Sequence, residues 1–146
     1  MSKYSDKAIQ LFYNGSTCSQ AVFAAFAPEL GLSEETALHI SLGLGGGVGR
    51  MREVCGAISG AAMLVGLRFP DITKAEAYKK VRLISNEFRK TNSSIICREL
   101  LGLSEPEKSY EPEPRTEEYY KKRPCIKIIG DAALAVEKIL FSEEDE

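Results

Sequence analysis

The chain has 146 residues, of which 44% are hydrophobic and 27% are charged, and its formal net charge at pH 7 is −2. This composition is ordinary for a soluble globular chain, and the length suits one domain, residues 1–146, with a core of its own. Because the basic residues are dispersed and the net charge is slightly negative, nothing in the sequence predicts nucleic acid as a partner.

No part of the sequence predicts export or membrane insertion. The longest apolar run, residues 54–67, has 14 residues, whereas a membrane helix needs about 20. The N-terminus has no apolar segment followed by a cleavage site, so it does not resemble a signal peptide. We therefore expect a cytoplasmic protein.

The first third of the chain has apolar residues at helical spacing. A first helix is expected over residues 5–13, ending at Asn14-Gly15. A second helix should begin after Ser16 or Thr17, with Cys18 in its first turn, and should bend or end near Pro28. Ser33 is the expected N-cap of a third helix.

A glycine-rich loop, residues 43–49, leads into a helix that has Cys55 in its first turn and extends to about residue 67. The loop cannot be aligned with G-x-G-x-x-G and no G-K-[ST] follows it, which argues against a nucleotide site. Free backbone N–H groups in the loop and at the helix start would favour a negative charge, such as a thiolate or a metal–thiolate centre. The candidate cofactor-binding residues are Gly46, Gly47, Gly49 and Gly56.

The second half of the chain should contain one long helix from a capping box at residues 73–76 to about residue 90, and a short helical turn that begins at Cys97. Residues 104–116 form a Pro/Glu-rich surface loop, followed by a short helix near 116–121 and a solvated turn around Tyr119-Tyr120. Pro124 suits the first position of the last helix, which puts Cys125 in its first turn.

No alternating run is long enough to predict a strand. The sequence therefore predicts an all-α fold, a single-domain bundle of five to six helices with cysteines at the helix N-termini. His39, the single histidine, is expected to be a structural residue rather than a ligand.

The four cysteines are the candidate site. No pair forms C-x-x-C, so a thioredoxin motif and a zinc-ribbon spacing are both absent, and structural disulfides are not expected without a secretory signal. At a helix N-terminus the free N–H groups and the dipole stabilise a thiolate and lower its pKa. Basic residues also lie close to three of the cysteines in the sequence. The candidate catalytic residues are Cys18, Cys55, Cys97 and Cys125.

Residues 55–60 read Cys-Gly-Ala-Ile-Ser-Gly. The chain resembles the C_GCAxxG_C_C family of small prokaryotic redox-active proteins, which have four signature cysteines and a CGAxxG motif. Cys18 stands at the first signature position, Cys55 opens the motif, and Cys97 and Cys125 stand at the third and fourth positions. The resemblance covers nearly the whole chain and implies redox activity at these cysteines.

Two kinds of chemistry are compatible with four converging thiols. In the first, one exposed thiol with a low pKa attacks a disulfide and a second thiol resolves the intermediate, with a redox partner protein or a small electron donor. In the second, the same four cysteines hold an iron–sulfur cluster or, less readily, a zinc ion. Dithiol–disulfide chemistry is our first hypothesis, and cluster or metal binding is its alternative. A third reading is a helical interaction module without chemistry.

Overall fold

The computed structural model describes residues 2–103 and 107–142. Within these residues the fold is all-α, as the sequence predicts. The helices are α1 (Lys3–Tyr13), α2 (Cys18–Phe26), α3 (Glu34–Ser41), α4 (Gly56–Arg68), α5 (Lys74–Arg89), α6 (Cys97–Leu100), α7 (Glu117–Lys122) and α8 (Cys125–Leu140). The described residues thus hold eight α-helices instead of five or six, because the short segments at Cys97 and Thr116 each close at least one α-helical turn.

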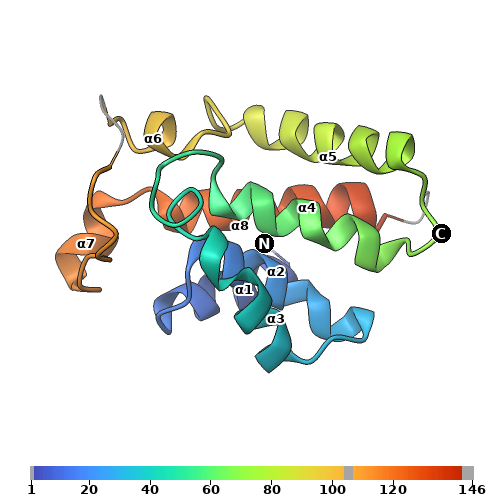
Figure 1. The fold of residues 1–146 in the computed structure, drawn as a ribbon, viewed down its shortest axis with the longest axis horizontal. Coiled ribbons are helices and arrows are strands. Elements are labelled where there is room, and N and C mark those ends of the chain that lie inside the picture. Colours follow the sequence, from blue (N-terminus) through green and yellow to red (C-terminus); the bar gives the residue numbers. More distant parts are fainter. Residues whose placement is uncertain (1, 104–106, 143–146) are drawn as a thin grey trace.

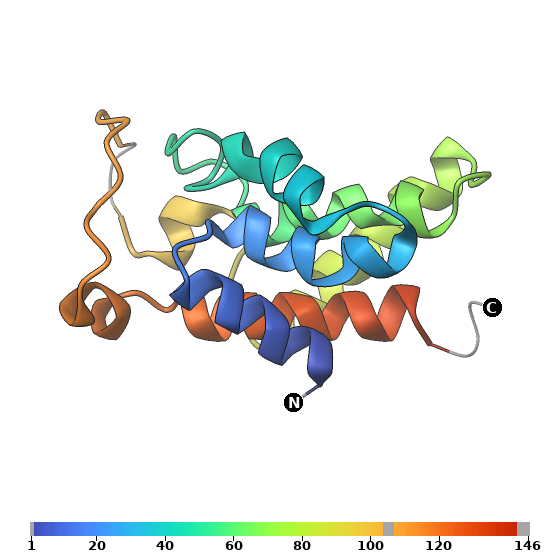
Figure 2. The same ribbon diagram turned by 90° about the horizontal axis from the view of Figure 1, so that it is seen from below.

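The long helices pack in layers. In Figure 1, α5 lies along one side, α4 and α8 form the middle, and α1, α2 and α3 cover the other side. Helix α4 packs against both α2 and α5, and α1 packs against α2 and α8. Figure 2 shows α1, α2 and α8 running side by side through the bundle. The largest fully buried side chains of the core include Phe12, Phe26, Leu64, Ile84, Phe88, Ile129 and Val136.

Local capping fixes where α2 begins. The Thr17 hydroxyl accepts a hydrogen bond from the Gln20 N–H (3.2 Å), and the Gln20 side chain accepts one from the Thr17 N–H (2.9 Å). This reciprocal capping box places Cys18 at the first helical position. The helix ends at Phe26, where a 3₁₀ turn containing Pro28 follows.

Helix α4 approaches α2 closely because its glycines have no side chain. A Cβ at Gly60 would lie 2.7 Å from the Ser19 carbonyl oxygen, and one at Gly56 would lie 3.0 Å from the Ser19 nitrogen. Backbone contact of this kind sets the distance between the two helix starts, which carry Cys18 and Cys55. The small-residue spacing in α4 thus serves packing in a helical bundle.

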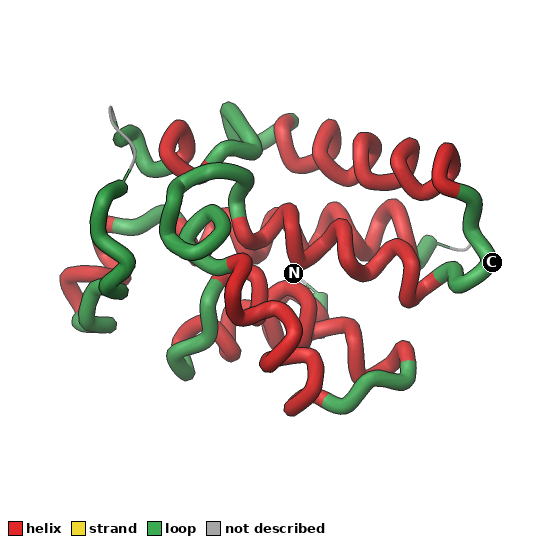
Figure 3. The backbone as a smooth tube through the Cα atoms, in the orientation of Figure 1, coloured by secondary structure: helices red, strands yellow, loops and turns green. Residues whose placement is uncertain are grey.

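A short extended contact joins the glycine-rich region to the segment before α6. Val54 and Ile96 form an isolated antiparallel bridge, with hydrogen bonds from the Cys55 N–H to the Ile95 carbonyl (2.7 Å) and from the Cys97 N–H to the Glu53 carbonyl (2.6 Å). The tube in Figure 3 has helices and loops but no strand over the residues it colours. The bridge holds the starts of α4 and α6 together.

No helix within residues 2–103 and 107–142 has both the length and the apolar character needed to cross a membrane.

Candidate functional site

All four cysteines line one cavity of about 370 Å³. Each cysteine stands at the start of a different helix. Cys18, Cys97 and Cys125 are the first residues of α2, α6 and α8, and Cys55 is the N-cap of α4. The prediction that the cysteines lie at helix N-termini is therefore confirmed, and the fold brings together positions that are up to 107 residues apart in the chain.

The cysteines are free thiols that differ in exposure. Cys55, Cys97 and Cys125 are buried, whereas Cys18 is half-buried. The side chains of Cys18 and Cys125 interact, and this interaction shifts the pKa values of the two thiols in opposite directions. Cys55 and Cys97 follow directly after the two residues of the Val54–Ile96 bridge, and the backbone N–H of each donates to a carbonyl of the opposite segment.

The thiols of Cys18 and Cys125 differ in pKa. The hydrogen bond from Cys18 is the largest cause that lowers the pKa of Cys125, and the nearby arginines, Arg123 foremost, lower it further. The same hydrogen bond raises the pKa of Cys18 well above its ordinary value, and burial adds to the rise. Of the two thiols, Cys125 is therefore the one that loses its proton more readily, and Cys18 is the one that keeps it.

The expectation that every helix N-terminus lowers the pKa of its cysteine is wrong for two positions. Burial raises the pKa of Cys55 to about 12, although the N–H groups of Ala57 and Ile58 oppose the rise. Burial also acts on Cys18. The thiol whose pKa is lowered, Cys125, is only 7% exposed, so the expected combination of low pKa and exposure in one thiol is not found either. Desolvation of a thiolate outweighs the helix start when the sulfur is buried.

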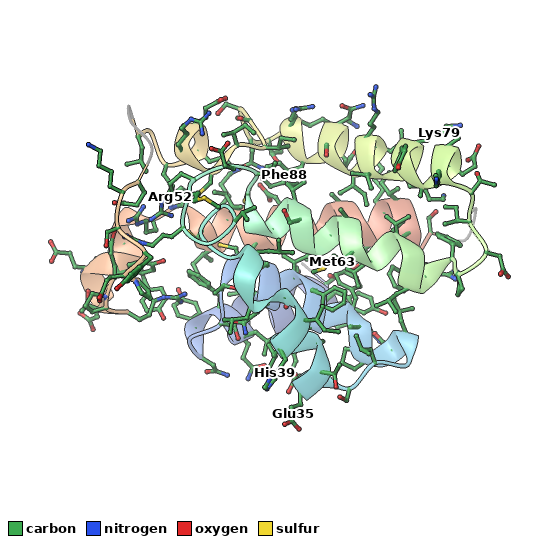
Figure 4. The ribbon with its side chains drawn as sticks, in the orientation of Figure 1. Glu35, His39, Arg52, Met63, Lys79 and Phe88 are labelled. Atoms are coloured by element: carbon green, nitrogen blue, oxygen red, sulfur yellow. The ribbon has the colours of Figure 1, made fainter. Side chains whose placement is uncertain are left out.

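Four arginines line the same cavity: Arg50, Arg52, Arg115 and Arg123. Arg52 is 7% exposed, and its Nη1 donates to the Cys97 sulfur at 3.6 Å. Figure 4 shows Arg52 beside a sulfur atom on the inner side of the glycine-rich loop. Sequence proximity suggests Arg52 as a neighbour of Cys55, whereas Arg52 donates its hydrogen bond to Cys97, because the bridge brings the start of α6 alongside.

The Pro/Glu-rich segment contributes to the site, which the sequence reading missed. Glu113 pairs with Arg50 (3.3 Å) and with Arg123, and Glu107 also pairs with Arg50 (3.6 Å). Arg115 donates to the carbonyl oxygens of Phe12 and Ser16, both at 3.1 Å. The stretch 107–123 contains five glutamates and, at 115 and 123, two arginines, and this mixture of charges is the signal that could have indicated ion pairs across the cavity.

The tyrosines that were expected in a solvated turn are packed instead. Tyr119 lines the cavity, and its ring centroid lies 6.4 Å from that of Phe12. Tyr120 meets Phe12 edge to face at 5.7 Å. Aromatic packing against α1 therefore orders α7, and α7 precedes Cys125 directly.

The glycine-rich loop differs in part from the predicted cradle of free N–H groups. Residues 46–50 all have positive φ, Val48 and Arg50 included, so the loop makes a left-handed turn. The N–H groups of Val48, Gly49 and Arg50 bond within the loop region, as in the bond from Gly49 to the Gly43 carbonyl (2.8 Å). The N–H groups of Gly46 and Gly47 have no backbone partner among the described residues.

Three of the four glycines picked from the sequence serve close approach. A Cβ at Gly47 would lie 2.7 Å from the Cys97 Cβ, and one at Gly56 would lie 3.4 Å from the Cys18 Cβ. Gly46 has positive φ, and a Cβ there would lie 2.8 Å from the Arg50 Cα. At Gly46, Gly47 and Gly56 the missing side chain leaves room for protein atoms, and at Gly49 the backbone φ of 55° is the requirement.

Whether a metal ion fits the cavity depends on how the possible ligand side chains are arranged. No three His, Cys, Asp or Glu side chains within the described ranges are arranged to hold a metal ion. His39 is exposed on α3 and does not line the thiol cavity (Figure 4). The four sulfurs share a cavity but do not form a ready set of ligands for a single ion such as zinc.

Comparison with known proteins identifies the family of the chain. Searches of curated proteins and of solved structures give no match. The family described as "Putative redox-active protein (C_GCAxxG_C_C)" matches residues 16–139, a range that contains all four cysteines and most of the bundle. The chain therefore belongs to the C_GCAxxG_C_C family of redox-active proteins.

Proposed function

We propose that the protein carries out dithiol–disulfide exchange, with Cys125 as the attacking thiolate and Cys18 as the resolving thiol. The observation that carries this proposal is that the two thiols interact within one cavity, with a lowered pKa at Cys125 and a raised pKa at Cys18. A thiolate is the nucleophile in such exchange, and a neighbouring thiol completes it.

The exchange is a two-electron reaction. The Cys125 thiolate attacks one sulfur of a substrate disulfide, forms a mixed disulfide, and releases the other sulfur as a thiolate. Cys18 passes its proton to that leaving thiolate and then attacks the Cys125 sulfur. The second substrate thiolate leaves, so the substrate is reduced by two electrons and the Cys18–Cys125 pair is oxidised to a disulfide. The reverse sequence oxidises a partner dithiol.

In this proposal Cys55 and Cys97 do not attack the substrate. Cys55 is 4% exposed and its pKa is about 12, so its thiol is protonated near neutral pH and a poor nucleophile. Cys97 lies under Gly47 and beside Arg52, which limits the space around its sulfur.

The decisive experiment identifies the disulfide that forms. Reduced protein is oxidised with a small excess of a low-mass disulfide, trapped with an alkylating reagent, and mapped by peptide mass spectrometry. We expect Cys18 and Cys125 in one linked peptide pair. Cys18→Ser should accumulate a stable mixed disulfide at Cys125, whereas Cys55→Ser, the matched control, should still form the Cys18–Cys125 disulfide. A linkage that does not involve Cys125 contradicts the proposal.

Protein isolated without oxygen gives the second check. The dithiol proposal expects a colourless sample with four titratable thiols. A brown sample that contains iron and sulfide in proportion to protein would assign the four cysteines to a cluster instead.

A further inference from the structure

Arg52 is a buried cation with an unused hydrogen-bond donor inside the thiol cavity. The side chain is 7% exposed, and its Nε is buried without a hydrogen-bond partner among the described residues. Among the described residues its Nη1 donates to the Cys97 sulfur alone, at 3.6 Å, and sulfur is a weak acceptor. Burial of a guanidinium with an unfilled donor costs free energy that a bound anion would offset.

The other arginines of the cavity are already engaged. Arg50 and Arg123 share the Glu113 carboxylate, and Arg115 donates to two backbone carbonyls. Arg52 has no such carboxylate within the part of the chain that the structure describes. The cavity lining contains four arginines and one glutamate, so positive charge is in excess there.

The position of Arg52 links this excess charge to the thiols. The same cavity of about 370 Å³ is lined by Arg52 and by all four cysteines, and its volume suits a small molecule. A guanidinium presents a planar fork of donors that matches a carboxylate. An anion held there by Arg52 would have the rest of its molecule beside the sulfurs.

We propose that Arg52 binds a carboxylate of the substrate, and that the preferred substrates are small disulfides that carry carboxylate groups. This inference rests on the dithiol exchange proposed above and names its substrate class. The chemistry is unchanged: Cys125 attacks the substrate disulfide, Cys18 resolves it, and two carboxylate-bearing thiols leave. Arg52 acts as the residue that orients the substrate and selects its charge.

Binding is measured first, in a background that cannot react. In the Cys18→Ser/Cys125→Ser protein, calorimetry measures the affinity for 3,3′-dithiodipropionate, a small disulfide with two carboxylates. We expect Arg52→Gln to weaken binding about ten- to a hundredfold, the usual effect of losing a charge-assisted bond in a buried site. Arg82→Gln is the matched control, because it removes an equal charge from an exposed position on α5 that does not line the cavity, and it should change the affinity by less than about threefold.

Undiminished binding to Arg52→Gln overturns the inference. If that variant does not fold by circular dichroism, Arg52→Lys takes its place, because lysine keeps the charge but lacks the guanidinium fork; we then expect a loss of about threefold or more, and unchanged binding again overturns the inference. Inorganic phosphate is titrated in the same background. Phosphate binding as tight as that of the disulfide would assign the site to a free oxyanion and overturn the substrate class.

The rate of a single oxidation separates this inference from the proposed function. With all cysteines present and reduced beforehand, the second-order rate constant for oxidation of the protein is measured with 3,3′-dithiodipropionate and with bis(2-hydroxyethyl) disulfide, which is uncharged and of similar size. We expect Arg52→Gln to lower the ratio of the anionic to the neutral substrate about tenfold. Equal loss or no loss for both substrates overturns the role of Arg52 while leaving dithiol exchange intact. Reduction of neither substrate by the wild-type chain, with Arg52-dependent binding preserved, contradicts the exchange chemistry instead.

Discussion

Cys55 and Cys125 both stand at a helix start, yet the pKa of Cys55 is raised to about 12 while that of Cys125 is lowered. The difference comes from what each sulfur contacts. Cys125 receives a hydrogen bond from Cys18 and faces Arg123, whereas burial dominates at Cys55. A helix N-terminus therefore favours a thiolate here only where a donor and a cation add to it.

The raised pKa of Cys55 makes stability depend on alkaline pH. Between the ordinary thiol pKa of 9.0 and about 12, the unfolded chain loses the Cys55 proton and the folded chain keeps it. The stabilisation is complete below pH 9 and is lost as the pH rises toward 12, by about 1.4 kcal/mol per pH unit. Cys55→Ala lacks this thiol, so we expect its free energy of unfolding to fall less steeply between pH 9 and 12, by about 1.4 kcal/mol per pH unit, in urea unfolding at several pH values. An identical pH slope in both proteins contradicts the assignment.

At the scale of single helices, Gly60 is needed for α4 to pack against α2, whereas Gly66 is not. A Cβ at Gly60 would lie 2.7 Å from the Ser19 carbonyl oxygen, which is backbone and cannot move aside cheaply. Gly66, on the same helix, has nothing within 4 Å of the added Cβ.

We expect Gly60→Ala to destabilise the protein by about 1–3 kcal/mol, because it forces α4 away from α2. Gly66→Ala should stabilise it by roughly 0.5–1 kcal/mol, since alanine is the better helix former in an open position. Thermal or urea unfolding measures both values. Equal effects of the two substitutions would show that helix propensity, rather than contact with α2, decides the role of Gly60.

The N-caps of α2 and α5 offer a second matched pair. The Thr17 hydroxyl accepts from the Gln20 N–H and the Thr73 hydroxyl accepts from the Glu76 N–H, each at 3.2 Å. We expect either threonine-to-alanine substitution to cost about 1 kcal/mol of stability. Thr17→Ala alone should also alter the alkylation rate at the Cys18–Cys125 pair, because Cys18 follows it directly. Equal alkylation rates in both variants would mean that the α2 cap does not position the thiol.

Across the whole molecule, residues 107–115 are held to the cavity by ion pairs. Glu113 bridges Arg50 and Arg123, which come from the glycine-rich loop and from the residue after α7. The segment thus connects two walls of the thiol site through one carboxylate.

We expect Glu113→Gln to loosen this connection and to speed alkylation of the buried cysteines severalfold, since the neutral amide weakens both pairs. Glu111→Gln, on an exposed position of the same segment, is the control and should leave the rate unchanged. Mass spectrometry of alkylated peptides over time measures both. A Glu113→Gln protein whose cysteines react at the wild-type rate would show that the ion pairs do not limit access.

The sequence predicts the helices well because their start signals are local. Thr17, Ser33 and Thr73 each cap the helix that follows, as hydroxyl spacing indicates. The resemblance also identifies all four cysteines. The sequence cannot supply the pairing of Cys18 with Cys125, because that contact depends on how α2 and α8 pack. It also misses the ion pairs of Glu113, whose partners lie 63 and 10 residues away.

The sequence also does not predict the left-handed turn of the glycine-rich loop, and the reason is a different one. Glycines permit positive φ, but Val48, Arg50 and Arg52 also adopt it, at a cost of about 1–2 kcal/mol per residue. Only the surrounding contacts, such as the Arg52 N–H to the Gly46 carbonyl (3.1 Å), make this conformation stable.

The cavity takes one sulfur from each of four helix starts, and the last of them opens the C-terminal helix. Cys18, Cys55 and Cys97 are therefore synthesised before Cys125, and the proposed exchange pair has no counterpart for Cys18 until α8 has been made and has docked. A chain cut short before residue 125 would lack the helix against which α1, α4 and α5 pack, so the thiol pair and the bundle that holds it depend on the same last element.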